Sequence, residues 1–161
     1  MTLTLIGLGM DKDDVTKKAA IAIKNAEIVI LKTNLNDSFS FFEENGIETV
    51  SLDYLYEKSR NFDTLTQNVV KEIKALSKGK EAVYCVEGSV FEDNACNEII
   101  SKFPGTQIIS GVSKATSALE KIGVNSGYTA LSAYDIEDLK YFDGAVCVYD
   151  VDSQALAGEV K

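Results

Sequence analysis

TLTLIGLGMDKDDVTKKAAIAIKNAEIVILK, residues 2–32, is the stretch that decides the fold class of this chain. Its first six residues, Thr2–Gly7, predict a strand. The apolar stripe that follows, at helical spacing, predicts a helix over Asp13–Ala26. Glu27–Lys32 is apolar at almost every position, which is typical of a strand that is covered on both faces. A strand, a helix and a second buried strand in this order predict the first unit of a parallel α/β sheet.

The same alternation continues to the last residue of the chain. We expect further strands over Ile47–Leu52, Ala82–Val86, Gln107–Ser110, Tyr128–Ala133 and Ala145–Tyr149. We expect further helices around Phe39–Phe42, over Phe62–Lys78, Asn94–Lys102 and Ser113–Ile122, in a short turn over Asp135–Lys140, and from Ser153 onward. This order predicts a parallel sheet with helices on both faces. Because no strand follows the last helix, we expect the chain to be a fragment of a longer protein.

The composition restricts the classes of partner. The formal net charge is −9, and this charge predicts that nucleic acids are repelled. The nearest approach to a basic patch is Lys71, Lys74, Lys78 and Lys80, which alternate with Glu72 and Glu81 as on a solvated helix face. The sequence shows neither a basic leader nor an apolar run of the roughly 20 residues that span a bilayer. We therefore expect a cytoplasmic protein without a membrane or nucleic-acid partner.

The residue types limit the chemistry. There is no histidine, which excludes histidine triads and removes the commonest transition-metal ligand. The three cysteines are scattered, and Cys85 and Cys147 lie in apolar runs, so we expect buried, inert thiols and no metal site. Asp150 and Asp152 are spaced like a metal pair, but capping of the terminal helix is the favoured interpretation.

Three glycine-bearing turns follow predicted strands. They are Gly7–Asp11, Glu87–Val90 and Ser110–Ser113. Ligands of open α/β sheets bind beyond the carboxyl ends of the strands, and glycine lets a ligand approach the backbone closely. Each turn alone is a weak signal, since Lys12 replaces the third glycine of a dinucleotide fingerprint and there is no phosphate-binding GK[ST] sequence. Together the three turns predict one binding cleft.

The same three segments carry a family resemblance. IGLGMDKDDVTKKAAIAIKNAEIVILKT, residues 6–33, resembles the opening of the tetrapyrrole (corrin/porphyrin) methylases, whose first loop usually contains GxGPGD. CVEGSVFEDNA, residues 85–95, lies where that family has a strand followed by PGDP or PGHP. IISGVSKATSALEKIGV, residues 108–124, resembles the family's PGVSS segment. The order and spacing of all three segments agree with the family.

The resemblance implies a fold, a ligand and an assembly. It implies an N-terminal α/β lobe over residues 1–112, part of a second α/β lobe over residues 113–161, and usually a homodimer. It implies S-adenosylmethionine or S-adenosylhomocysteine in the cleft between the lobes. The positions that match the family's ligand contacts are Gly9, Met10, Glu87, Gly88, Ser89, Ser113, Lys114 and Asp150. Methyl transfer depends mainly on alignment of donor and acceptor, so we assign no catalytic side chain.

Two departures from the family pattern favour an alternative. Met10–Lys12 replaces the family's Pro-Gly-Asp, and Glu87–Val90 replaces Pro-Gly-Asp-Pro. LDYLYEKSRNFDTLTQNVVKEI, from residue 52, and the C-terminal segment from residue 130 resemble the methylase-type domain that precedes MazG nucleotide pyrophosphohydrolases. The chain would then be a catalytically silent regulatory or dimerisation domain, covalently linked to a C-terminal MazG-type hydrolase.

The hydrolase itself is not indicated by the sequence. A MazG-type hydrolase binds Mg²⁺ through clustered carboxylates. Glu43, Glu44 and Glu48 come nearest to such a cluster, but Gly46 interrupts them. A third hypothesis, methylation of a protein as in diphthine synthase, rests on GLGMDKDDVT, residues 7–16, which resembles that branch of the family too.

Overall fold

The structure is a computed structural model that describes residues 2–58, 62–125, 127–133, 137, 140–149, 151 and 154–160. It consists of two compact units, Met1–Lys114 and Ala115–Lys161. Each unit is described by itself below.

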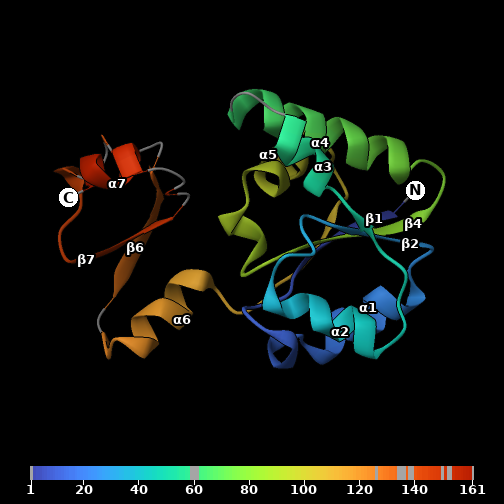
Figure 1. Cartoon of the computed structure of the whole chain (residues 1–161), viewed down its shortest axis with the longest axis horizontal. Helices are drawn as coiled ribbons and strands as arrows, with labels where there is room; N and C mark the ends of the chain where they lie inside the picture. The colour runs from blue at the N-terminus through green and yellow to red at the C-terminus, as the bar shows by residue number, and fades with distance from the viewer. Residues whose placement is uncertain are drawn as a thin grey trace. The chain divides into compact units, whose positions relative to one another are not determined.

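A five-stranded sheet forms the centre of the first unit (Figure 1). Its strands are β1 (Thr2–Gly7), β2 (Ile28–Leu31), β3 (Val50–Ser51), β4 (Glu81–Val86) and β5 (Gln107–Ile109). They lie in the order β3-β2-β4-β1-β5, and every pairing is parallel. The predicted α/β fold with a parallel sheet is confirmed. Because all five strands run the same way, their carboxyl ends meet at one edge of the sheet.

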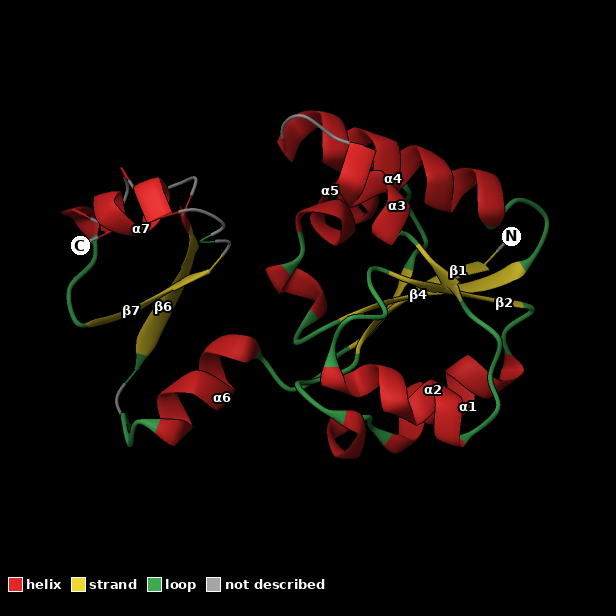
Figure 2. Ribbon diagram, viewed as in Figure 1, coloured by secondary structure: helices red, strands yellow, loops and turns green. Residues whose placement is uncertain are grey.

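Helices cover both faces of this sheet (Figure 2). One face carries η1 (Lys12–Asp14), α1 (Lys17–Asn25), η2 (Asp37–Phe39) and α2 (Ser40–Glu44). The other carries α3 (Asp53–Lys58), α4 (Phe62–Leu76) and α5 (Asn94–Lys102), and the short η3 (Val90–Glu92) precedes α5. Alternate side chains of β4 enter the two cores: Tyr84 and Val86 pack with α4 and α5, whereas Val83 and Cys85 pack with α1 and α2.

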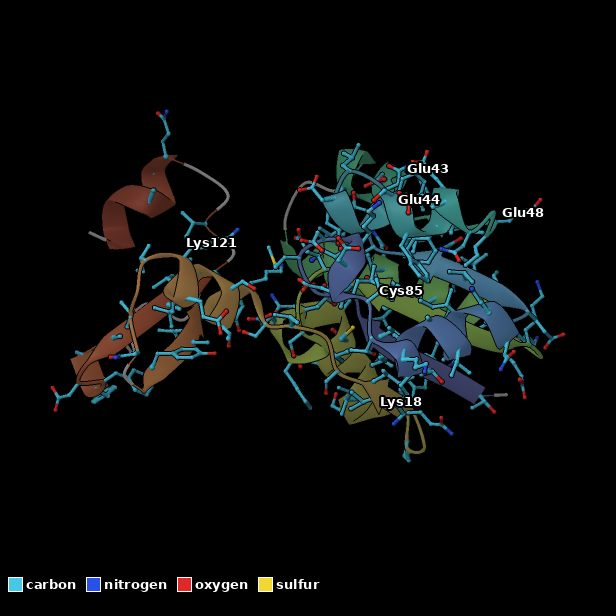
Figure 3. The ribbon with its side chains drawn as sticks, turned by 90° about the horizontal axis from the view of Figure 1, so that it is seen from below. Lys18, Glu43, Glu44, Glu48, Cys85 and Lys121 are labelled. Atoms are coloured by element: carbon cyan, nitrogen blue, oxygen red, sulfur yellow. The ribbon has the colours of Figure 1, made fainter. Side chains whose placement is uncertain are left out.

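The three cysteines differ in their surroundings. Cys85 and Cys96 are buried, and Figure 3 shows Cys85 deep within the first unit. Burial raises the pKa of the Cys85 thiol, which keeps it protonated and inert, as expected. Cys147 is only half-buried, so the prediction of a buried thiol is wrong at that position. Its strand, β7 (Ala145–Tyr149), is half-buried along its whole length, although its sequence is apolar.

The second unit is built around a two-stranded parallel sheet. Strand β6 (Tyr128–Ser132) pairs with β7 from Tyr128 opposite Ala145 to Ser132 opposite Tyr149. The helices are α6 (Lys114–Lys121), whose first residue is the last of the first unit, and α7 (Gln154–Val160). The predicted turn over Asp135–Lys140 lies largely outside the described residues. Within the described parts of both units, none of the helices has the length and apolar character that crossing a bilayer requires.

The first predicted helix differs most from the structure. Asp11 accepts hydrogen bonds from the backbone N–H groups of Asp13 and Asp14, at 2.8 and 3.2 Å, and so caps the short η1. The chain then becomes extended at Val15, and Thr16 caps α1 by accepting from the N–H of Ala19 at 3.1 Å. Two capping residues in succession therefore divide the predicted helix into two. Helix α3 was not predicted, and β3 is shorter than its predicted range.

Candidate functional site

The turns after β1 and β4 are joined backbone to backbone. The N–H of Gly9 donates to the carbonyl of Gly88 at 3.2 Å, and the N–H of Gly88 donates to the carbonyl of Gly9 at 2.8 Å. Both glycines have positive φ, 79° and 73°, a conformation that other residues rarely adopt. The first two of the three predicted turns are therefore parts of one structure.

The turn after β5 approaches the same place. A Cβ atom on Gly111 would lie 2.4 Å from the carbonyl carbon of Gly7 and 2.5 Å from the carbonyl oxygens of Gly7 and Gly88. A Cβ atom on Gly7 would lie 2.5 Å from the Gly88 oxygen. Neither Gly7 nor Gly111 has positive φ, so the close approach of the backbones, and not the backbone conformation, requires glycine there. The three turns form what we call the three-turn junction, which comprises Gly7–Gly9, Glu87–Ser89 and Gly111–Lys114.

A buried carboxylate ties two of these turns together. Glu92 is 8% exposed. One of its oxygens accepts from the backbone N–H groups of Ser89, at 2.9 Å, and Lys114, at 3.0 Å. The other accepts from the hydroxyl of Ser113 at 2.8 Å. Sequence reasoning missed Glu92, although the Ser-x-x-Glu spacing from Ser89 to Glu92 is the signature of a capping box.

Two side chains of opposite charge lie across the junction. The Lys114 ammonium is 3.7 Å from a carboxylate oxygen of Glu87, and about a third of each side chain is exposed. The aliphatic part of Lys114 lies against Gly88, where an added Cβ would be 2.6 Å from Cγ of the lysine. The side chain of Lys114 therefore covers part of the Gly88 backbone.

The first turn is held by a different acid. The N–H of Met10 donates to a carboxylate oxygen of Asp14 at 2.9 Å, and the Asp14 side chain packs against Gly9. The buried hydroxyl of Ser38 faces the Gly9 carbonyl at 3.5 Å. Met10 occupies the place where the resembling family often has proline, and proline has no N–H to make this bond. The substitution thus replaces a rigid residue with a hydrogen bond.

A buried ion pair adjoins the junction at the ends of β2 and η3. The Lys32 ammonium lies 2.8 Å from a carboxylate oxygen of Asp93, whose side chain is 5% exposed. The other oxygen of Asp93 caps α5 by accepting from the N–H of Cys96 at 2.8 Å. Burial raises the pKa of the nearby Tyr56 to about 12. No spacing pattern in the sequence indicates this pair, because its members lie 61 positions apart.

Seven of the eight predicted ligand-contacting residues lie in the three-turn junction or directly beside it, and Asp150 lies outside the described residues. The described part of the chain contains no group of three or more Cys, Asp or Glu residues arranged to hold a metal ion. Glu43, Glu44 and Glu48 are exposed and lie at the rim of the first unit in Figure 3, with Glu44 paired to Lys12.

Comparisons with known proteins bear on the family and the fold of the chain. The family model described as tetrapyrrole (corrin/porphyrin) methylases matches residues 2–140. A crystal structure of diphthine synthase superposes with a TM-score of 0.66 at 20% sequence identity. The likeness covers 94% of this chain and 65% of that one, so this chain spans less than two thirds of its length. At this identity the likeness shows the fold alone. No curated protein sequence matches the chain.

Proposed function

The chain belongs to the tetrapyrrole (corrin/porphyrin) methylase family, and from this premise we propose that its three-turn junction binds S-adenosylmethionine or S-adenosylhomocysteine. The single observation that supports the proposal best is the convergence of Gly9, Gly88 and Gly111 at the carboxyl edge of β1, β4 and β5. This edge is where open parallel sheets bind their ligands.

The charges at the junction suit the methionine part of such a ligand, which carries one ammonium and one carboxylate group. Glu87 would accept from the ligand's ammonium group, and Lys114 would donate to its carboxylate. Their 3.7 Å separation places both partners within reach of one amino acid group. The backbone N–H groups of Gly9, Met10, Gly88 and Ser89 are already bonded within the protein, so their carbonyl oxygens are the groups that we assign to the ligand. We assign Ser113 to the same ligand.

The reaction that this ligand would support is methyl transfer. The transfer is an in-line displacement at carbon that depends on alignment and requires no histidine. We propose that the two units are the family's two lobes, divided near residues 112 and 113, and that the active form is a homodimer. The methyl acceptor would be a small molecule of the tetrapyrrole class.

A second candidate is a catalytically silent domain that regulates or dimerises a covalently linked MazG-type hydrolase. The observation that favours it is the Lys114 side chain, which lies over Gly88 at the place where the family's Pro-Gly-Asp-Pro is replaced by Glu87–Val90. A junction covered by its own side chain binds a ligand only if that side chain moves.

Calorimetric titration of the chain with both ligands separates the two candidates. Under the first, S-adenosylhomocysteine binds, and ligand at 100 times Kd raises the thermal midpoint by roughly 5–10 °C, from about 2.7 kcal/mol of linkage. Lys114→Met should weaken binding by roughly tenfold, because a charge-assisted hydrogen bond is lost. The matched control is Lys102→Met, which removes an exposed lysine paired with Glu98 at the C-terminal end of α5.

Two outcomes would contradict the first candidate. Neither heat nor a thermal shift at millimolar concentrations of either ligand would leave the silent domain as the better account. Equal weakening by Lys114→Met and Lys102→Met would show that the junction is not the binding site.

A further inference from the structure

A cavity of about 310 Å³ lies at the opposite end of the sheet from the three-turn junction. Its apolar walls come from Leu3 at the start of β1, from Val70 and Ile73 on α4, and from Ile99 on α5. The turn Phe103–Thr106, which leads into β5, closes one side. Ligand pockets of proteins are concave, mostly apolar and about 300–1,000 Å³ in volume, so this cavity is of a size to hold a small ligand.

Two polar residues border this apolar lining, the exposed Lys74 on α4 and the buried Ser77 directly after it. Lys74 is the single charged residue among the described residues that line the cavity, and its ammonium lies 5.3 Å from the centre of the Phe103 ring. Ser77 also lines the cavity and is completely buried. Its hydroxyl oxygen has no hydrogen-bond partner within the described part of the chain. Buried hydroxyls are usually paired. The Ser77 oxygen is closed to solvent, so it would gain an acceptor in the cavity only if its side chain turned toward it.

The spacing of these two residues defines the group that would satisfy both. Residues three apart lie on the same side of a helical turn, with Cβ atoms about 5–6 Å from each other. One carboxylate has two oxygens and can accept from an ammonium and from a hydroxyl at the same time. The lining offers no acidic partner that would compete for Lys74, although the whole chain has a net charge of −9.

We propose that this cavity binds a small monocarboxylic acid with an apolar body. The Ser77 hydroxyl turns toward the cavity, so that the carboxylate accepts from it and from the Lys74 ammonium. The apolar body lies against Leu3, Val70 and Ile99. The site is separate from the proposed methyl-donor site, because it opens at the amino ends of β1 and β5 and the junction lies at their carboxyl ends. Its test is therefore independent of the proposed function.

The probes are octanoate and 3-phenylpropanoate, each compared with its neutral amide. Backbone amide chemical shifts of the ¹⁵N-labelled chain report where each probe binds. We expect both acids to move the signals of Ser77, Phe103 and Thr106 and to leave Gly9 and Gly88 unchanged. We expect the amides to bind about tenfold more weakly, since a charge-assisted pair is lost. A preference between the two acids would tell an alkyl from an aromatic ligand.

Two variants test the named groups. Lys74→Gln should weaken octanoate binding about tenfold, whereas Lys71→Gln, an exposed lysine on the same helix that does not line the cavity, should leave it unchanged within twofold. Ser77→Ala should weaken binding at least threefold and should not lower the thermal midpoint, because the hydroxyl makes no bond that the variant loses. A structural role for Ser77 would give the opposite pair of results.

Three results would overturn the proposal. The first is no shift with either acid up to 10 mM, on the order of the weakest binding expected for so small a ligand. The second is equal binding of acids and amides, which would remove the role of Lys74. The third is movement of the same signals with protein concentration alone, which would assign the cavity to a second copy of the chain.

Discussion

Gly111→Ala is the change that tests the three-turn junction most directly. The added methyl group would lie 2.4–2.5 Å from three backbone atoms, two of Gly7 and one of Gly88, where ordinary contacts are 3.4–4 Å. These atoms belong to the main chain and cannot turn aside as a flexible side chain could. We therefore expect at least one turn to move by about 1 Å, which would loosen the contacts of Glu92 as well.

The expected cost follows from overpacking. Inserting a methylene into a filled site costs about 1–3 kcal/mol, and contact with rigid backbone atoms of two residues favours the upper end. For a chain of this length, 3 kcal/mol lowers the thermal midpoint by roughly 6–12 °C. Gly127→Ala is the matched control, because Gly127 also lacks positive φ but an added Cβ would meet nothing within 4 Å. There the loss of backbone freedom in the unfolded chain should stabilise by about 0.5 kcal/mol.

The assay is urea denaturation of both variants, followed by far-ultraviolet circular dichroism. Gly7→Ala provides a second reading of the same junction, since its Cβ would lie 2.5 Å from the Gly88 oxygen. If Gly111→Ala unfolds at the same urea concentration as Gly127→Ala, the backbones are not in contact, and the convergence of the turns would be refuted together with the proposed ligand site.

Three other predictions concern the groups beside the junction. Lys32→Met should destabilise the protein by roughly 2–3 kcal/mol, because it leaves Asp93 buried without its partner. Lys102→Met breaks an exposed pair and should cost less than about 0.5 kcal/mol in the same urea titration. Glu92→Gln should cost about 2 kcal/mol by thermal or urea unfolding, since an amide presents N–H groups to donors that now meet a carboxylate. Burial raises the pKa of Tyr56 from 10.0 to about 12, so the folded state holds the phenol proton more tightly than the unfolded state does. This difference contributes roughly 2–3 kcal/mol to the free energy of unfolding, which is complete below pH 10 and is lost as the pH rises to 12. Tyr56→Phe should flatten this part of the dependence of stability on pH.

The sheet and most of its helices could be predicted from the sequence because each depends on local patterns. The apolar runs of β2 and β4 and the stripe of α4 are typical of buried elements, and the observed bounds differ from the predicted ones by one or two residues in most cases. Asp11 and Thr16 show the limit of this reasoning. Each is a good capping residue, and the sequence pattern does not reveal that both are used in succession.

The candidate site was only partly predictable, for a different reason. Glycine at three strand ends indicated that the three turns share one edge, since parallel strands end together. The residues that hold the turns, Glu92 and Asp14, form their bonds only after the turns have met. The sequence likewise does not indicate that Ser77 and Lys74 border one cavity, because the apolar walls around them come from separate elements.

A test of function must distinguish junction residues that the fold requires from those that are available to bind a ligand. Gly7 and Gly111 are required because backbones touch there, and Gly9 and Gly88 because their φ angles are positive. All four glycines would be required even in a domain that binds no ligand. The glycine pattern therefore indicates the fold and gives no information about activity. Neither close backbone contact nor positive φ requires the charged pair Glu87 and Lys114. Both side chains are partly exposed, and the 3.7 Å between their charged groups is long for an ion pair. A substitution that spares stability but changes ligand affinity is therefore expected at these two positions and not at the glycines, which makes Lys114→Met the variant that separates a methyl-donor site from a silent copy of one.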